Sequence, residues 1–453
     1  MRLVFRQIDY EMIRETDMCE IRRFAVLLFW CVGIFVQGCS GTDGFGASTK
    51  LNEGGYGLGV DRPEAVGLSS EKLLRINRVM QGYVDDGKVA GIVTVVARRG
   101  KVAYFECFGM ADIETGRPME TDSIFRIFSM SKPITSVAVM MLYEEGWFQL
   151  GDPVSKYIPE LKDMKVFVKK TEAGVETVAA ERQITIRDLL LHTSGLGYGL
   201  DKNDPVDVMY AEGQMLRGDE TLEEKIKRLA ELPLANQPGT EWRYSISIDV
   251  LGRLVEVVSG KSFDEFLRQR LFGPLKMNDT GFYVPVEKHQ RFCGLYKRDE
   301  GGKLVRSEGI GRYNDFLSRP KFLSGGGGLV STAGDYMRFC QMLLNGGELD
   351  GVHILGRKTV EYMTMNHLTD ELAASVEMKG AGFGLGFGVV TDVAATGIVG
   401  SEGTYSWGGA ANTYFWVDPK EELIGIFMTQ LMPWGSYPVH DEFKVLVYQA
   451  IVD

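Results

Sequence analysis

Two side chains in the first third of the sequence have the types and the spacing that nucleophilic catalysis needs. Ser129 lies three positions before Lys132, and an apolar-periodic run at 133–146 follows, which predicts a helix. Residues three apart share one face of a helix, so the lysine amine is expected beside the serine hydroxyl. A serine needs such a base to attack a carbonyl carbon, and N–H groups at the start of the helix would lie near the same oxygen. The pair therefore predicts acyl transfer through a serine ester.

The same Ser-x-x-Lys spacing occurs twice more, so spacing alone does not identify a site. Ser69 precedes Lys72 at the start of an amphipathic run, where a serine is better interpreted as a helix cap. Ser318 precedes Lys321 in a proline-containing segment that is predicted to be a loop. The corresponding alternative for Ser129 is a capping serine followed by a solvated lysine.

Two further motifs supply groups that an acyl-transfer site uses. Tyr244 follows a Pro-Gly turn and precedes a helical pattern, and a tyrosine near a lysine can be held as phenolate and act as general base. Near the C-terminus, the tripeptide Trp407–Gly409 leads into a strand. Its glycines allow the backbone to approach a substrate, so the N–H groups of Ala410 and Ser129 are predicted to form an oxyanion hole. Taken alone, Tyr244 would be interpreted as a core aromatic residue.

The elements around these motifs predict a mixed α/β fold. β-rich runs at 89–98 and 101–109 predict an antiparallel hairpin, and the last third of the chain returns to strands before a closing helix. Helical patterns dominate residues 185–275. This order predicts one sheet built from both chain ends, with a helical insertion. The expected boundaries are residues 61–125 and 322–453 for the sheet domain and residues 126–321 for the mainly helical domain.

The first 38 residues carry the features of an export signal. The apolar run at 24–36 follows two arginines and is too short to span a bilayer about 30 Å thick, but it fits the central region of a signal peptide. Cys39 follows in a stretch that resembles a bacterial lipobox, which makes it the candidate for a lipid anchor. Residues 39–60 predict a flexible tether. We expect an exported protein, periplasmic or anchored as a lipoprotein; the alternatives are a buried or surface-lying N-terminal helix and a cytoplasmic protein.

Composition excludes several other classes. The chain has 453 residues, of which 45% are hydrophobic and 25% charged, as in ordinary folded proteins. A net charge of −11 and the lack of any Lys/Arg-rich run argue against nucleic acid as a partner. The six cysteines form no Cys-x-x-Cys motif and the five histidines no His-Glu-x-x-His motif, so a zinc site or disulfide framework is not expected. We expect neither a metal nor a cofactor.

The ordered set of Ser129, Lys132, Tyr244 and Trp407–Gly409 resembles the serine β-lactamase and penicillin-binding-protein superfamily. More narrowly, it resembles the carboxylesterases of family VIII. The resemblance extends from about residue 61 to the C-terminus and includes three further stretches, 146–161, 185–196 and 325–347. It implies an antiparallel β-sheet flanked by helices and joined to a helical domain, as in class C β-lactamases and DD-peptidases, with the active site between the two parts.

The resemblance also implies a role for each motif. Ser129 is expected to be the acylated nucleophile, with Lys132 and Tyr244 as the proton-transfer pair; which of the two is the formal base stays open. The third wall of the site is expected to consist of Trp407, Gly408 and Gly409. Water, or another alcohol, would then release the acyl group from the enzyme.

Two departures from the superfamily's motifs bear on the substrate. Trp407 stands where lactamases and peptidases carry a lysine that attracts a substrate carboxylate, and tryptophan offers only apolar area and an N–H donor. Ile246 replaces the asparagine of the lactamase Tyr-x-Asn motif, which leaves Lys132 with one orienting partner fewer. Neutral esters are therefore expected to be preferred over anionic β-lactams.

We expect a serine hydrolase, a carboxylesterase whose partner is a small-molecule ester, with weak β-lactam hydrolysis as a side activity. The alternatives are an acyltransferase, a β-lactamase or a D-amino-acid peptidase of the same superfamily, and a penicillin-binding sensor that is acylated without turnover. His192 is expected to be a structural, hydrogen-bonding histidine, and glycines 325–328 a turn beside the site. The sequence does not indicate an oligomeric state.

Overall fold

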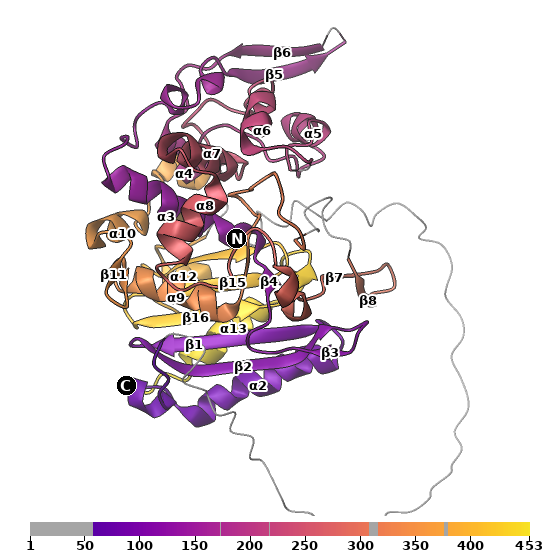
Figure 1. Ribbon diagram of the computed structural model, residues 1–453, viewed down its shortest axis with the longest axis vertical. Coiled ribbons are helices and arrows are strands. Elements are labelled where there is room, and N and C mark those ends of the chain that lie inside the picture. Colours follow the sequence, from indigo (N-terminus) through magenta and orange to yellow (C-terminus); the bar gives the residue numbers. More distant parts are fainter. Residues whose placement is uncertain (1–57, 173, 217, 308–315, 376–378) are drawn as a thin grey trace, which may run out of the picture.

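The centre of the molecule is an eight-stranded antiparallel sheet (Figure 1). The computed structural model describes residues 58–172, 174–216, 218–307, 316–375 and 379–453. The strand order is β12-β13-β14-β15-β16-β1-β2-β3, and β1 pairs with β16 from Val93↔Met428 to Arg98↔Leu423. Both ends of the chain therefore contribute to one sheet. The strands are β1 (Gly91–Arg98), β2 (Lys101–Asp112), β3 (Arg117–Pro118), β12 (Ala381–Phe383), β13 (Gly388–Val390), β14 (Tyr405–Gly409), β15 (Thr413–Asp418) and β16 (Leu423–Met428).

The hairpin of β1 and β2 confirms the sequence prediction. Its two-residue turn is formed by Arg99 and Gly100, both with positive φ (52° and 73°), as tight hairpin turns require. Every residue of β1 is buried, because helices cover both faces of the sheet. The stretch 383–393 does not form one continuous strand, because it contributes to two short strands, β12 and β13, that pair with each other.

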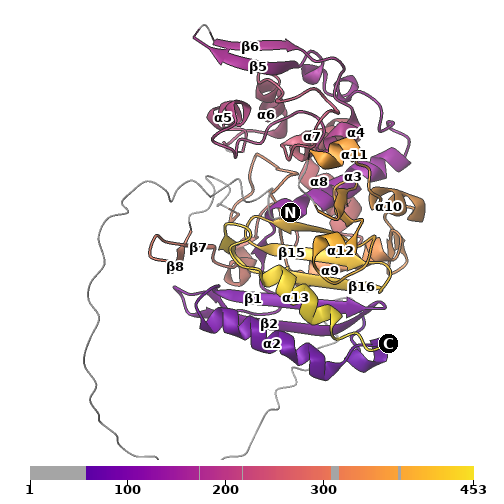
Figure 2. The ribbon, with the colours of Figure 1, turned by 180° about the vertical axis from the view of Figure 1, so that it is seen from behind.

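Helices flank the sheet on both faces (Figures 1 and 2). On one face lie α2 (Ser70–Asp85) and α13 (Val439–Tyr448), and on the other lies α9 (Ala333–Leu344), which packs against β1 and β16. Ser69 caps α2 by accepting a hydrogen bond from the N–H of Lys72 at 3.3 Å. This contact confirms the capping interpretation of the first extra Ser-x-x-Lys match.

The helical part is organised around α3 (Ser131–Glu144), which packs against α7 (Ser247–Ser259). Twelve residues of α3 are buried, because neighbouring elements surround the helix. The other helical elements here are α4 (Ile186–Leu191), α5 (Pro205–Glu212), α6 (Leu222–Leu229), α8 (Phe263–Leu267) and the π-helical η5 (Arg268–Phe272). The 3₁₀ turns are η1 (Pro63–Val66), η2 (Phe128–Met130), η3 (Val154–Lys156), η4 (Pro159–Leu161) and η6 (Val286–Arg291).

Part of the C-terminal segment lies beside the helical part. Two helices of the C-terminal segment, α10 (Arg357–Met363) and α11 (Asp370–Ala374), lie beside the helical part, and Ser375 accepts the backbone N–H of Trp242 at 3.3 Å (Figure 2). Strands also occur within 126–321. The remaining elements are β4 (Phe125–Arg126), β5 (Lys165–Thr171), β6 (Gly174–Ala179), β7 (Tyr296–Arg298), β8 (Leu304–Arg306), β9 (Val330–Ser331), β10 (Glu348–Leu349), β11 (Val352–His353), α12 (Val393–Thr396) and β17 (Leu431–Met432).

The expected export signal (1–38) and Cys39 lie outside the described residues, as does most of the expected tether. The prediction that the tether extends to residue 60 is wrong. Leu58 is buried and Val60 pairs with Val102 of β2, so residues 58–60 belong to the folded domain. Within the ranges that the structure describes, helices are too short or too polar to cross a membrane.

Candidate active site

Ser129 lies at the sharp turn that leads into α3. It is the middle residue of the 3₁₀ turn η2, which ends directly before the first residue of the helix, and its side chain is 5% exposed. The preceding residue, Phe128, has a φ of 42°, which is unusual for a residue with a side chain and costs conformational energy. The helix begins at Ser131, so the predicted start at 133 is two residues late.

Lys132 lies in the first turn of α3 and is 1% exposed. Its Nζ donates to the Gly326 carbonyl oxygen at 2.7 Å, the Tyr198 hydroxyl at 3.0 Å and Ser129 Oγ at 3.3 Å. Burial lowers the pKa of Lys132 to about 7, against the opposing charge of Asp249. An amine that releases its proton near neutral pH, beside a serine hydroxyl, has the properties of a general base.

Tyr244 completes this group from the loop that precedes α7. Lys132 Nζ lies 4.5 Å from the centroid of its ring. Burial raises the pKa of Tyr244, while the neighbouring Ser129 hydroxyl and Trp407 indole act in the opposite direction. The net direction favours the neutral phenol, so the phenolate that sequence reasoning allowed is not the form that this environment stabilises.

Aromatic rings surround the Tyr244 side chain. Its ring centroid lies 4.9 Å from that of His192, 5.1 Å from that of Tyr198 and 5.8 Å from that of Trp407, and Trp242 stacks on it at 6.2 Å. These contacts fix the plane of the phenol. They also bring Tyr244 and Trp407, which are far apart in the sequence, into direct contact.

His192 has the structural environment that the sequence predicts. Its Nδ1 accepts the backbone N–H of Ser245 at 3.2 Å, and burial lowers its pKa well below the usual value. The imidazole is therefore neutral, and its ring packs against the ring of Tyr244.

The tripeptide Trp407–Gly409 lies within β14, whereas the sequence placed it before a strand. Trp407 pairs with Phe415 and Gly409 with Thr413 of β15. A β-carbon at Gly409 would lie 2.3 Å from the Ile127 carbonyl oxygen, so glycine is what allows β14 to approach the nucleophile turn. Ala410 follows in the turn to β15, partly buried in the cluster that contains Phe128.

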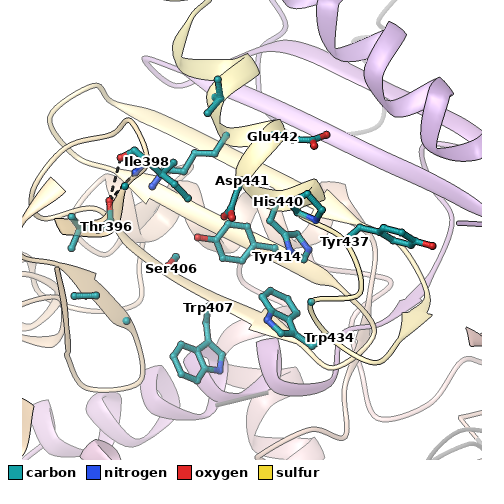
Figure 3. Close-up of a pocket in the computed structure, with 18 of the residues that line it drawn as sticks. Thr396, Ile398, Ser406, Trp407, Tyr414, Trp434, Tyr437, His440, Asp441 and Glu442 are labelled. Carbon is teal, nitrogen blue, oxygen red and sulfur yellow. Dashed lines mark hydrogen bonds between the residues drawn. The ribbon is translucent and has the colours of Figure 1, made fainter. Parts of the chain in front are cut away.

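Trp407 is 1% exposed, and its ring also contacts Phe383 at 5.3 Å. The indole therefore forms a wall behind Tyr244. It also lines a cavity of about 1020 Å³ (Figure 3), whose other walls include Tyr414 and the stacked pair Trp434 and His440. Of the predicted site residues, Trp407 is shared between this cavity and the group around Ser129.

Sequence reasoning missed two polar residues of the site, Tyr198 and Asp249. Tyr198 accepts from Lys132, and Asp249 is a fully buried carboxyl in the first turn of α7. The sequence contained a signal for Asp249, which is an acidic residue within an apolar helical pattern. A carboxyl group is rarely buried without a partner, so its position indicated a polar contact inside the protein. The glycines at 325–328 form a turn beside the site, as predicted, and Gly326 supplies its carbonyl to Lys132.

Among the residues that the structure describes, His, Cys, Asp and Glu side chains do not gather in a group of three or more that could hold a metal ion. The polar groups described above instead form hydrogen bonds with one another beside a serine. A serine, a lysine and a tyrosine that converge in this way between a helical part and an antiparallel sheet form an arrangement suited to acyl transfer.

Residues 76–449 match the protein family described as Beta-lactamase, and the chain belongs to this family. Protein Rv1367c from Mycobacterium tuberculosis (strain ATCC 25618 / H37Rv) is 39% identical over 359 residues, which cover 77% of this chain and 88% of that protein. Esterase EstB from Burkholderia gladioli is 32% identical over 409 residues, 85% of this chain and 98% of EstB. The solved structure of EstCE1, a hydrolase with promiscuous acyltransferase activity, is 29% identical with a TM-score of 0.72, covering 83% of this chain and 99% of EstCE1.

The expected membership of the serine β-lactamase and penicillin-binding-protein superfamily is therefore confirmed, together with its fold. The protein is a hydrolase-type enzyme of this superfamily, which includes esterases and acyltransferases.

Proposed function

We propose that the protein is a carboxylesterase that cleaves small, neutral carboxylic esters through an acyl-enzyme on Ser129. The observation that carries this proposal is the contact between Lys132 Nζ and Ser129 Oγ at 3.3 Å, made by a buried amine with a pKa of about 7. Such an amine is partly unprotonated at neutral pH, so it can accept the serine proton. The similarity to esterase EstB supports an ester as the substrate.

In the first step, the neutral amine of Lys132 takes the proton of Ser129 as Oγ bonds to the ester carbonyl carbon. The carbonyl oxygen becomes an oxyanion, and the backbone N–H groups of Ser129 and Ala410 stabilise it. Tyr244, a neutral phenol, gives its proton to the leaving alcohol oxygen as the ester C–O bond breaks, and the Lys132 ammonium returns a proton to Tyr244. Lys132 is thus the base and Tyr244 the acid.

In the second step, water attacks the acyl-enzyme carbonyl. Its proton passes to Lys132, the Ser129 Oγ–carbon bond breaks, the pair returns the proton to Oγ, and the carboxylic acid leaves. No metal or cofactor enters either step. The buried indole of Trp407, in the place of a lysine, supports a preference for neutral esters, because an anionic substrate finds no cation on β14.

A second candidate function is acyl transfer to an alcohol. The observation that favours it is the similarity to EstCE1, which extends over 99% of that chain and whose description includes acyltransferase activity. The chemistry is the same until deacylation, where an alcohol replaces water. Analysis of the products formed with an added alcohol acceptor separates the two functions.

A panel of p-nitrophenyl esters of increasing chain length, assayed beside nitrocefin and a D-Ala-D-Ala peptide, tests the proposal. We expect the highest kcat/KM with a short ester, and a mass increase of one acyl group on the peptide that contains Ser129. A faster reaction with the peptide or nitrocefin would assign the protein to the peptidases or β-lactamases. One product equivalent per enzyme, without further turnover, would indicate a sensor.

We also propose that the chain is exported and carries a lipid on Cys39, on the strength of the apolar run at 24–36 and the stretch that follows it. The test is expression of the full chain in a bacterium, followed by fractionation and mass spectrometry of the N-terminal peptide. A Cys39→Ala variant should move from the membrane fraction to the soluble fraction. Unmodified Cys39 in a cytoplasmic protein would contradict the proposal.

A further inference from the structure

Asp249 is a buried carboxyl that holds the loop behind Lys132. It is 1% exposed, five residues after Tyr244, and lies in the first turn of α7. Its Oδ1 accepts the Ser324 hydroxyl at 2.5 Å and the backbone N–H of Gly326 at 3.2 Å. Asp249 therefore fixes both the start of the glycine turn and its central residue.

The peptide groups of Gly326 connect this carboxylate to the lysine. Its N–H donates to Asp249, and its carbonyl oxygen accepts from Lys132 Nζ at 2.7 Å. A β-carbon at Gly326 would lie 2.6 Å from Asp249 Oδ2 and 3.5 Å from Lys132 Nζ. The carboxylate and the amine thus flank the same glycine, and a side chain at this position would displace at least one of them.

We propose that Asp249 is a positioning residue of the active site: through Ser324 and Gly326 it holds the carbonyl group that orients the amine of Lys132 toward Ser129. The inference rests on the proposed function, because it assigns Lys132 the role of base. Burial raises the pKa of Asp249, whereas the Ser324 hydroxyl and the charge of Lys132 act in the opposite direction. In its ionised form Asp249 has a second effect, because its charge raises the pKa of Lys132 and offsets part of the effect of burial.

Among the described residues, three other titratable side chains that face Lys132 are uncharged. Tyr198 and Tyr244 are phenols, and His192 is neutral because burial lowers its pKa. Asp249 also acts on Lys225, whose Nζ pairs with Glu220 at 3.1 Å. Burial lowers the pKa of Lys225, and the charge of Asp249 raises it. Asp249 is therefore the carboxylate that acts on two buried lysines.

Asp249→Asn tests the proposal, because asparagine keeps the shape and the Oδ1 acceptor but removes the charge. The pKa of Lys132 should fall, so the acid limb of kcat/KM against pH should move to lower pH by about one unit. Ser324→Ala removes one hydrogen bond to the carboxyl group and leaves Asp249 itself in place. It should lower kcat by a factor of about 10, and because the lost hydrogen bond also favours the ionised carboxylate, it should move the acid limb less than Asp249→Asn does. Together the two variants separate the orienting effect from the charge effect.

Asp335→Asn is the matched control. Asp335 is also a buried carboxyl that accepts a backbone N–H, from Asp279 at 2.7 Å, but it lies in the first turn of α9 and its charged neighbours are Asp279 and Lys288. Its pH profile should match that of the wild type. Thermal unfolding of each variant shows whether it folds, and Ser324→Ala, the mildest change, keeps the test available if Asp249→Asn is unstable.

An unchanged acid limb in folded Asp249→Asn, together with an unchanged kcat in Ser324→Ala, overturns the proposal. The rate of Ser129 acylation by p-nitrophenyl acetate, followed by intact mass, gives a readout that does not depend on the natural substrate. Failure of the proposed function would be seen as wild-type enzyme that does not acylate Ser129. Failure of this inference would be seen as normal wild-type acylation that the Asp249 and Ser324 variants leave unaltered.

Discussion

The two sides of the candidate site are built in different ways. On the side of Lys132, the contacts are hydrogen bonds, which its Nζ donates to Ser129, Tyr198 and Gly326. On the side of Tyr244, the contacts are ring against ring, and Trp407 is fully buried among them. The polar side fixes where protons can move, whereas the aromatic side fixes the shape of the site and keeps charge away from it. Changes on the first side should alter rate and pH dependence, and changes on the second should alter the choice of substrate.

The largest effect is expected where the polar side meets the substrate. Ser129→Ala removes the atom that forms the acyl bond, so turnover of esters should fall by at least about 10³-fold. Ser69→Ala, at the helix cap that has the same Ser-x-x-Lys spacing, should leave kcat/KM near the wild-type value. Ester turnover near the wild-type rate in Ser129→Ala would remove the basis for the acyl-enzyme.

Tyr244 lies on the boundary between the two sides, and Tyr244→Phe shows to which side it belongs functionally. As the acid that protonates the leaving group, it should contribute about 10²-fold with ethyl esters. The loss should be much smaller with p-nitrophenyl esters, because nitrophenolate leaves without a proton. Equal losses with both substrates would instead assign Tyr244 as the base.

The pH dependence of the wild-type enzyme sharpens the same distinction. Protonated Lys132 cannot accept a proton, so kcat/KM should fall about tenfold for each pH unit below about 7 and level off above it. Burial raises the pKa of Tyr244, so no alkaline limb should appear below about pH 10. The measurement is kcat/KM with a p-nitrophenyl ester from pH 5 to 9, for which about two units on each side of the midpoint suffice. A profile without the acid limb would contradict Lys132 as the base.

The smallest effect is expected on the aromatic side. Trp407→Lys restores the cation that lactamases carry on this strand, so the ratio of nitrocefin to ester turnover should rise by a factor of about 10 or less. The gain is limited because the new ammonium would be placed in a buried position. Trp407→Phe is the control, since it keeps a neutral ring, and its ratio should stay close to that of the wild type. A ratio that Trp407→Lys leaves unchanged would reject charge as the reason for ester preference.

The features that the sequence predicted correctly depend on local pattern. The β1–β2 hairpin and the Ser69 cap follow from turn and cap residues, and the closeness of Ser129 and Lys132 follows from helical spacing. Tyr244 and Trp407 were selected because their residue types suit acyl transfer and because the set of motifs resembles a family, since no local rule brings the two side chains together. Their contact depends on tertiary packing.

The features that the sequence did not predict correctly depend on packing between distant segments. Asp249 becomes a site residue because α7 packs against α3, which places its carboxylate behind the Gly326 turn. The neutral state of Tyr244 results from burial, which the sequence does not display.

The pairing of β1 with β16 has a consequence for how the protein matures. Val93 and Met428, which face each other in the sheet, are separated by most of the chain, and Leu68 likewise pairs with Ile451. A chain still emerging from the ribosome therefore lacks the central strand until synthesis is nearly finished, and such distant contacts form slowly. Labelling of the nucleophilic serine by a serine-reactive probe would consequently show that folding is complete. A chain truncated before its final strands should not be labelled, although it already contains that serine.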